Sequence, residues 1–224
     1  MPGILSNYLS KQRSKKVLPY LKGDILDVGC GPGFNSVYLK DKFINYIGID
    51  YSEEFIKIAK SLHSNGIFVA GNVKSLKALN LENPDLIIGI GILHHIDNLN
   101  EALMSLKEIA KNDTVLAFSE PFRGNPGIQL LRYFRKKIDP DYSKDQVFFS
   151  KRELVDLFNN NGFEVKNVKY QGFFSTPFAQ VVLKPKEFFY PVSKASIIFD
   201  RFIQKVIKLP IFWNIQIVAK VKGN

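Results

Sequence analysis

The chain has 224 residues, of which 46% are hydrophobic, and its formal net charge is +10. This length fits one α/β domain with an elaboration or a small lid, and the apolar content is enough for a hydrophobic core. No apolar run is long enough to span a bilayer. The single cysteine, Cys30, excludes an internal disulfide and favours a cytoplasmic location.

Strand and helix patterns alternate along the first half of the chain. The predicted elements are a leading helix over 4–20, strands over 24–28, 45–50, 67–70 and 85–90, and a helix that begins at Ser52 and stops at Asn65 and Gly66. The helix after Ser52 is expected to bury an apolar stripe of Phe55, Ile58, Ala59 and Leu62.

The second half continues the alternation. It contains a helix from Asn98, a strand over 115–119, a helix from Ser150 to Asn161, a strand from Phe163 and a last strand with Ile215, Ile217 and Val221. Asn98 with Glu101, and Ser150 with Glu153, have the spacing of capping boxes. Alternating strands and helices predict a mostly parallel sheet covered on both faces.

Residues 171–213 separate the last two strands and are too many for an ordinary connection. They contain several phenylalanines and one amphipathic helix. This insertion could pack on the sheet, wall a substrate pocket or lie on a membrane surface. We therefore divide the chain, as a single domain over 1–224, into a leading helix (1–22), a core (23–170), the insertion (171–213) and a final strand (214–224).

A glycine loop follows the first strand, because Asp27 precedes three alternating glycines, Gly29, Gly31 and Gly33. Glycines let a ligand approach bare backbone, and the following helix offers free N–H groups. A dinucleotide fingerprint would need a third glycine at position 34, where this chain has Phe34.

This loop resembles the cofactor loop of class I S-adenosylmethionine (SAM) methyltransferases. The sequence Leu93-His94-His95 after the fourth strand also resembles that superfamily, and the resemblance covers roughly residues 13–119. It implies a Rossmann-like, doubly wound sheet of seven strands with an antiparallel last strand, and SAM as the cofactor. Members of the superfamily often form homodimers, which stays open here.

The resemblance also implies which residues bind the cofactor. Asp50 ends the second strand, where an acid can accept both ribose hydroxyls, although it could instead cap the next helix. Asn72 stands where the family commonly has an aspartate facing the adenine amino group, and its alternative role is an ordinary turn. The full expected set is Arg13, Asp27, Gly29, Cys30, Gly31, Gly33, Asp50, Tyr51, Asn72, Val73 and Ile90.

Three residues are candidates for catalysis: His94, His95 and Glu120. Histidine titrates near neutrality and suits a general base, although either ring could instead cap or pack the turn that follows. Neighbouring residues on a turn point in different directions, so at most one histidine is expected to face the substrate. Glu120 could accept a substrate proton or be a solvated loop acid. No Cys/His cluster has metal-ligand spacing, so no metal is expected.

The expected function is methyl transfer from SAM to a small-molecule or lipid-like acceptor, such as a quinone or phenol precursor, a glycan sugar or a secondary metabolite. Oxygen is favoured as the accepting atom. RNA methylation is an alternative, because a basic run covers 132–137. Such a run is more often a solvated helix face, so a nucleic-acid partner is not expected. A non-catalytic SAM-binding subunit and a peripheral membrane contact stay open.

Overall fold

A computed structural model describes a large part of the chain. The described residues are 23–39, 43–81, 83–127, 129–130, 133, 148–172, 195, 198–200, 202–203 and 212–223. The leading helix predicted over 4–20 and most of the insertion predicted over 171–213 lie outside them.

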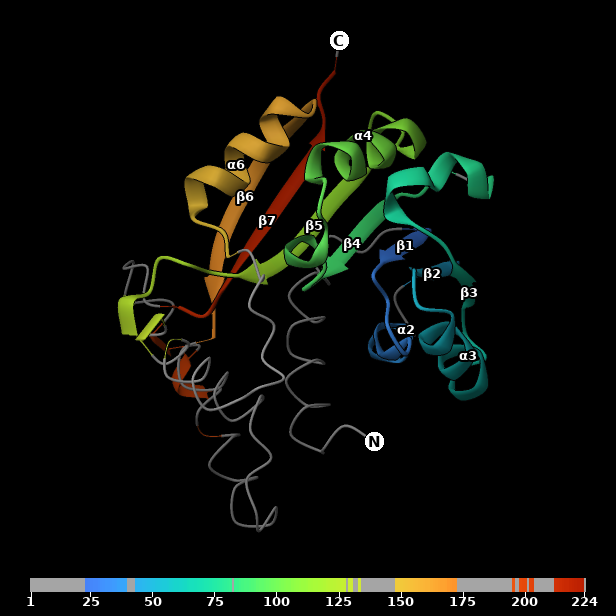
Figure 1. Cartoon of the computed structure of the whole chain (residues 1–224), viewed down its shortest axis with the longest axis horizontal. Coiled ribbons are helices and arrows are strands. Elements are labelled where there is room, and N and C mark those ends of the chain that lie inside the picture. Colours follow the sequence, from blue (N-terminus) through green and yellow to red (C-terminus); the bar gives the residue numbers. More distant parts are fainter. Residues whose placement is uncertain are drawn as a thin grey trace.

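Within the described residues, seven strands form one sheet in the order β3-β2-β1-β4-β5-β7-β6 (Figure 1). Their bounds are Ile25–Val28 (β1), Tyr46–Asp50 (β2), Ile67–Ala70 (β3), Leu86–Ile90 (β4), Val115–Pro121 (β5), Phe163–Gln171 (β6) and Asn214–Val221 (β7). Strands β1 to β5 are parallel, and β7 runs antiparallel to both β5 and β6. The predicted Rossmann-like α/β fold with an antiparallel last strand is confirmed.

Helices cover both faces of this sheet, with α4 and α6 on one face and α2 and α3 on the other (Figure 1). The helices are α2 (Phe34–Tyr38), α3 (Glu53–Leu62), α4 (Leu99–Ile109) and α6 (Lys151–Asn160), with short 3₁₀ helices η2 (Val73–Leu79) and η3 (Leu93–His95). Two hydrophobic clusters correspond to the two faces. One contains Leu106 of α4 and Phe158 of α6, and the other contains Ile56 and Ala59 of α3.

The helix starts follow the predicted capping residues. The Ser150 hydroxyl and the Glu153 side chain form a complete capping box at α6. At α4 the Asn98 side chain accepts from the Glu101 N–H at 3.3 Å, but the Asn98 N–H donates to Asp97 Oδ1 at 2.9 Å. The predicted capping box expected the Glu101 side chain to accept from the Asn98 N–H, but the Asp97 side chain accepts from it instead.

The predicted apolar stripe of α3 is only partly right. The structure buries Ala59, as predicted, together with Ile56, while Phe55 and Leu62 are 43% and 57% exposed and Ile58 is half-buried. Two neighbouring rows of apolar residues in this helix both have helical spacing. Periodicity alone does not decide which row faces the sheet, and the packed row is the one that includes Ile56.

Candidate active site

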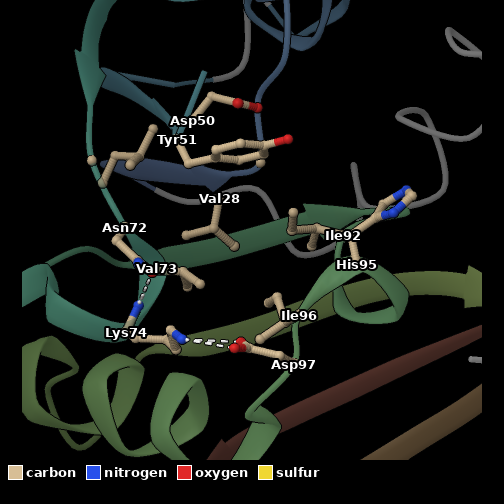
Figure 2. Close-up of a pocket in the computed structure, with 13 residues that line it drawn as sticks. Val28, Asp50, Tyr51, Asn72, Val73, Lys74, Ile92, His95, Ile96 and Asp97 are labelled. Atoms are coloured by element: carbon tan, nitrogen blue, oxygen red, sulfur yellow. Dashed lines mark hydrogen bonds and ion pairs between the residues drawn. The ribbon is translucent and has the colours of Figure 1, made fainter. Parts of the chain in front are cut away.

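A cavity of about 230 Å³ opens at the carboxyl ends of β1, β2 and β3, beside the loop that follows β4 (Figure 2). Open α/β sheets bind their ligands at this edge. It is lined by Val28, Gly29, Ile49, Asp50, Tyr51, Gly71, Asn72, Val73, Lys74, Ile92, His95, Ile96 and Asp97. Six of the residues predicted from the sequence are therefore brought together here, namely Gly29, Asp50, Tyr51, Asn72, Val73 and His95.

Asp50 is the acid at the end of β2, and its carboxylate ties two loops together. Its Oδ2 atom accepts from the Gly31 N–H at 2.9 Å, and its Oδ1 atom accepts from the Ser52 N–H at 2.9 Å. The N-cap of α3 is Ser52, whose hydroxyl accepts from the Phe55 N–H. Asp50 is thus not the helix cap, and it lines the cavity with a carboxylate whose oxygens can each accept a further hydrogen bond.

The three glycines of the loop share a positive φ angle but differ in the space available for a side chain. Gly29, Gly31 and Gly33 have φ angles of +70°, +52° and +80°, which L side chains rarely adopt. A Cβ atom at Gly29 would collide with the Ile92 side chain, and one at Gly33 would collide with Phe68. Among the described residues, no atom lies within 4 Å of a Cβ placed at Gly31. Packing therefore requires Gly29 and Gly33, whereas Gly31 borders open space within this part of the chain.

Asp27, which was predicted to contact the cofactor, lies beneath the glycine loop and does not line the cavity. Its side chain is fully buried and accepts from Asn35 Nδ2 at 2.9 Å and from the Tyr46 hydroxyl. Burial raises the pKa of Asp27 to about 6. Cys30 is buried in the same region, and burial raises the pKa of its thiol.

Asp27→Asn should change how stability depends on pH. An unfolded aspartate titrates near pH ~4, whereas the folded protein keeps a proton on Asp27 up to about pH 6. The folded state therefore binds more protons in this interval, and the free energy of unfolding should fall as pH rises through it, by roughly 2–3 kcal/mol. Asp27→Asn should remove this fall, which urea denaturation at a series of pH values between about 4 and 8 would measure.

The matched control for this change is Asp156→Asn, because the Asp156 side chain is 57% exposed on α6. This variant should keep the pH dependence of the wild-type protein. An Asp27→Asn protein that still loses stability over the same pH interval would contradict the assignment.

Asn72 follows β3 and caps η2, because its Oδ1 atom accepts from the Lys74 N–H at 2.9 Å. The oxygen that was expected to face an adenine amino group therefore already has one backbone partner. Lys74 in turn forms an ion pair with Asp97 at 2.9 Å, which joins η2 to the loop after η3 at one side of the cavity (Figure 2).

Several lining residues were not predicted from the sequence. Val28, Ile92 and Ile96 present apolar side chains to the cavity, and Lys74 and Asp97 supply the ion pair beside them. Each of them lies within a few residues of a predicted site residue, so sequence proximity was the available signal. Ile90 pairs with Ser119 in the sheet and is not part of the lining. Arg13 lies outside the described residues.

Glu120 is fully buried at the end of β5, so the view of it as a solvated loop acid is wrong. Its Oε1 atom accepts from the backbone N–H groups of Ile92 and Leu93 at 3.0 and 2.9 Å. Its Oε2 atom lies 2.8 Å from Nδ1 of His94. One carboxylate therefore holds both the backbone of the loop after β4 and the imidazole of His94.

The two histidines have different surroundings although they are adjacent. His95 lines the cavity, whereas His94 is bound to Glu120, and the two ring centroids are 4.0 Å apart. Burial and the neighbouring His94 ring lower the pKa of His95 below the ordinary histidine value, so its imidazole is neutral at pH ~7. His94 is the histidine with a carboxylate partner.

Within the part of the chain that the structure describes, no group of three His, Cys, Asp or Glu side chains could hold a metal ion. Among the same residues, no helix has the length and apolar character that crossing a membrane requires.

Residues 6–168 match the methyltransferase domain family. Over 156 residues, 66% of this chain, the sequence is 24% identical to the ubiquinone biosynthesis O-methyltransferase of Rickettsia canadensis (strain McKiel). Over 83 residues, 34% of this chain, it is 35% identical to the O-antigen chain terminator bifunctional methyltransferase/kinase WbdD of Escherichia coli. The structure of a SAM-dependent methyltransferase from Archaeoglobus fulgidus is similar, with a TM-score of 0.66 and 20% identity, over 96% of this chain and 94% of that one.

These matches differ in how much of each protein they cover. The aligned part of the chain spans 65% of the Rickettsia protein and 12% of the Escherichia coli protein, which is less than two thirds of either. The family match, in contrast, includes every strand from β1 to β5 and most of β6. The chain therefore belongs to the methyltransferase domain family, within the class I SAM-dependent methyltransferases.

Proposed function

We propose that this protein transfers the methyl group of SAM to an oxygen atom of a small-molecule acceptor. The observation that carries the proposal is the link between Asp50 and Gly31, because one carboxylate both lines the cavity and orders the glycine loop. A pocket built in this way at the carboxyl ends of β1 and β2 suits a nucleoside with an extended, charged substituent.

The lining residues divide according to the parts of the cofactor. Asp50 would accept hydrogen bonds from the ribose hydroxyls. The apolar side chains of Val73, Ile92 and Ile96 would contact the adenine ring, with Asn72 at its polar edge. Gly31, the glycine that borders open space, would lie against the methionine part.

Bound SAM supplies an electrophilic methyl group on a sulfonium. The protein must align the acceptor oxygen opposite the departing sulfur, and alignment of this kind can lower a barrier by about 7–11 kcal/mol at best. A hydroxyl acceptor must also lose its proton as the new C–O bond forms and the C–S bond breaks. We assign that proton to Nε2 of His94, since the Nδ1–H of His94 can donate to Glu120.

The name of one relative supports oxygen as the accepting atom, because it is a ubiquinone biosynthesis O-methyltransferase. The buried Glu120 carboxylate, which lies 2.8 Å from Nδ1 of His94, fits the removal of a hydroxyl proton.

Calorimetric titration tests the cofactor assignment directly. SAM and its demethylated product should each bind once per chain, and NAD should not bind. The Gly31→Ala variant should bind SAM more weakly, because its Cβ would enter the space proposed for the methionine part and its φ of +52° strains an L residue. Absence of SAM binding, or binding of NAD in its place, would refute the proposed function.

A further inference from the structure

Four polar side chains are buried together where β5, β6 and β7 meet. Ser119, Gln171, Asn214 and Gln216 are only 5%, 4%, 8% and 2% exposed. Ser119 is opposite Gln216 across β5 and β7, and Gln171 is opposite Asn214 across β6 and β7. Because side chains alternate along a strand, these residues share one face of the sheet.

Two atoms of this polar cluster have no hydrogen-bond partner within the described residues: Gln171 Oε1 and Gln216 Nε2. The other end of the Gln171 amide donates to Ser119 Oγ at 3.0 Å. Turning the Gln171 amide around would give its oxygen the Ser119 partner and leave its nitrogen without one. A buried polar atom without a partner costs about 1–3 kcal/mol, so such atoms require an explanation.

The polar cluster adjoins the candidate active site. Ser119 is opposite Ile90 of β4, and its carbonyl accepts from the Gly91 N–H at 2.8 Å. Gly91 opens the loop that carries His94, and the residue after Ser119 is Glu120, which holds that loop. The cluster therefore lies at the same carboxyl edge of the sheet as this loop, with the Ser119 and Glu120 side chains on opposite faces of β5. A methyl acceptor that contacts both must lie across this edge.

We propose that Gln171 and Gln216 bind a hydroxyl group of the methyl acceptor. Gln171 Oε1 lacks a donor and Gln216 Nε2 lacks an acceptor, and a hydroxyl group supplies both. A carboxylate could only accept, and a hydrocarbon could do neither, so the site selects polyhydroxylated acceptors such as sugars or catechols. This inference depends on the proposed function, whose acceptor class it narrows.

Gln216→Met tests the proposal, because methionine keeps the length of the side chain and removes its amide. A ligand-binding role and a structural role of the Gln216 amide lead to opposite expected effects on stability. If the amide serves to bind a ligand, its removal should leave the melting temperature unchanged or higher, since an apolar group replaces a buried unpartnered one. If the amide supports the fold, the melting temperature should fall.

The probes are catechol and D-mannose, added to the protein together with S-adenosylhomocysteine and followed by ligand-observed NMR. At least one probe should bind the wild-type protein, and Gln216→Met should weaken that binding by about tenfold. Gln129→Met is the matched control, because the Gln129 amide already donates to the Arg123 carbonyl and Gln129 is not one of the four cluster residues.

The proposal is overturned if neither probe binds the wild-type protein, if Gln216→Met binds it as tightly as the wild-type protein, or if Gln216→Met lowers the melting temperature. Binding of S-adenosylhomocysteine is measured in the same samples. Its loss would count against the proposed function, whereas its persistence without probe binding would count against the hydroxyl site alone.

Discussion

Glu120→Gln should lower kcat by about 10²–10⁴-fold, the range that a general base contributes, while SAM affinity stays close to that of the wild-type protein. Glu120 does not line the cavity, and its carboxylate acts through His94 at 2.8 Å. Glutamine keeps an oxygen for the N–H groups of Ile92 and Leu93, so the loop should keep its backbone position. What glutamine lacks is the charge that favours a protonated imidazole in the transition state.

Double-variant kinetics separate this positioning role from a purely structural one. His94→Gln should lower kcat as much as Glu120→Gln does, and the double variant should be no slower, since the two residues act as a unit.

Glu120→Ala provides the contrasting result. It leaves the N–H groups of Ile92 and Leu93 buried without an acceptor, so stability should fall by roughly 2–5 kcal/mol together with activity. A Glu120→Gln enzyme that turns over at the wild-type rate would refute the assignment of His94 and Glu120.

The fold was predictable because its signals are local. Ser52 and Ser150 begin helices at the expected residues, and the glycine loop follows β1 as its spacing indicated. The orientation of α3 was not predictable, since two apolar rows compete and only the packing of Ile56 and Ala59 decides between them. The sequence shows the helical period of α3, but which face of the helix is buried depends on how it packs on the sheet.

The position of the candidate site in the fold was predictable, but the hydrogen bonds that its residues make were less so. Asp50 and Asn72 were expected to present free oxygens, yet both accept backbone N–H groups of neighbouring loops. Glu120 is held by the loop after β4, and Ile92 of this loop lies 28 residues earlier in the chain. Contacts of such separation leave no periodic signal, so only the folded structure shows that this acid organises His94.

Asp50→Ala should weaken SAM binding by roughly tenfold to 100-fold, which corresponds to about 1–3 kcal/mol of lost hydrogen bonding. Two effects combine in this variant. The ribose hydroxyls lose their proposed acceptor, and the Gly31 N–H loses its 2.9 Å bond to Oδ2, which frees the glycine loop from the end of β2. Calorimetric titration with SAM measures the sum of both effects.

Ser52→Ala distinguishes lost affinity from lost stability, because it alters the neighbouring helix without touching the cavity. Its hydroxyl accepts from the Phe55 N–H at 3.2 Å, so removing it should cost stability of about 1 kcal/mol, the usual value of an N-cap. SAM affinity should stay unchanged in this variant. Equal affinities in Asp50→Ala and the wild-type protein would remove Asp50 from the cofactor site, whereas a loss confined to Asp50→Ala ties binding to that carboxylate.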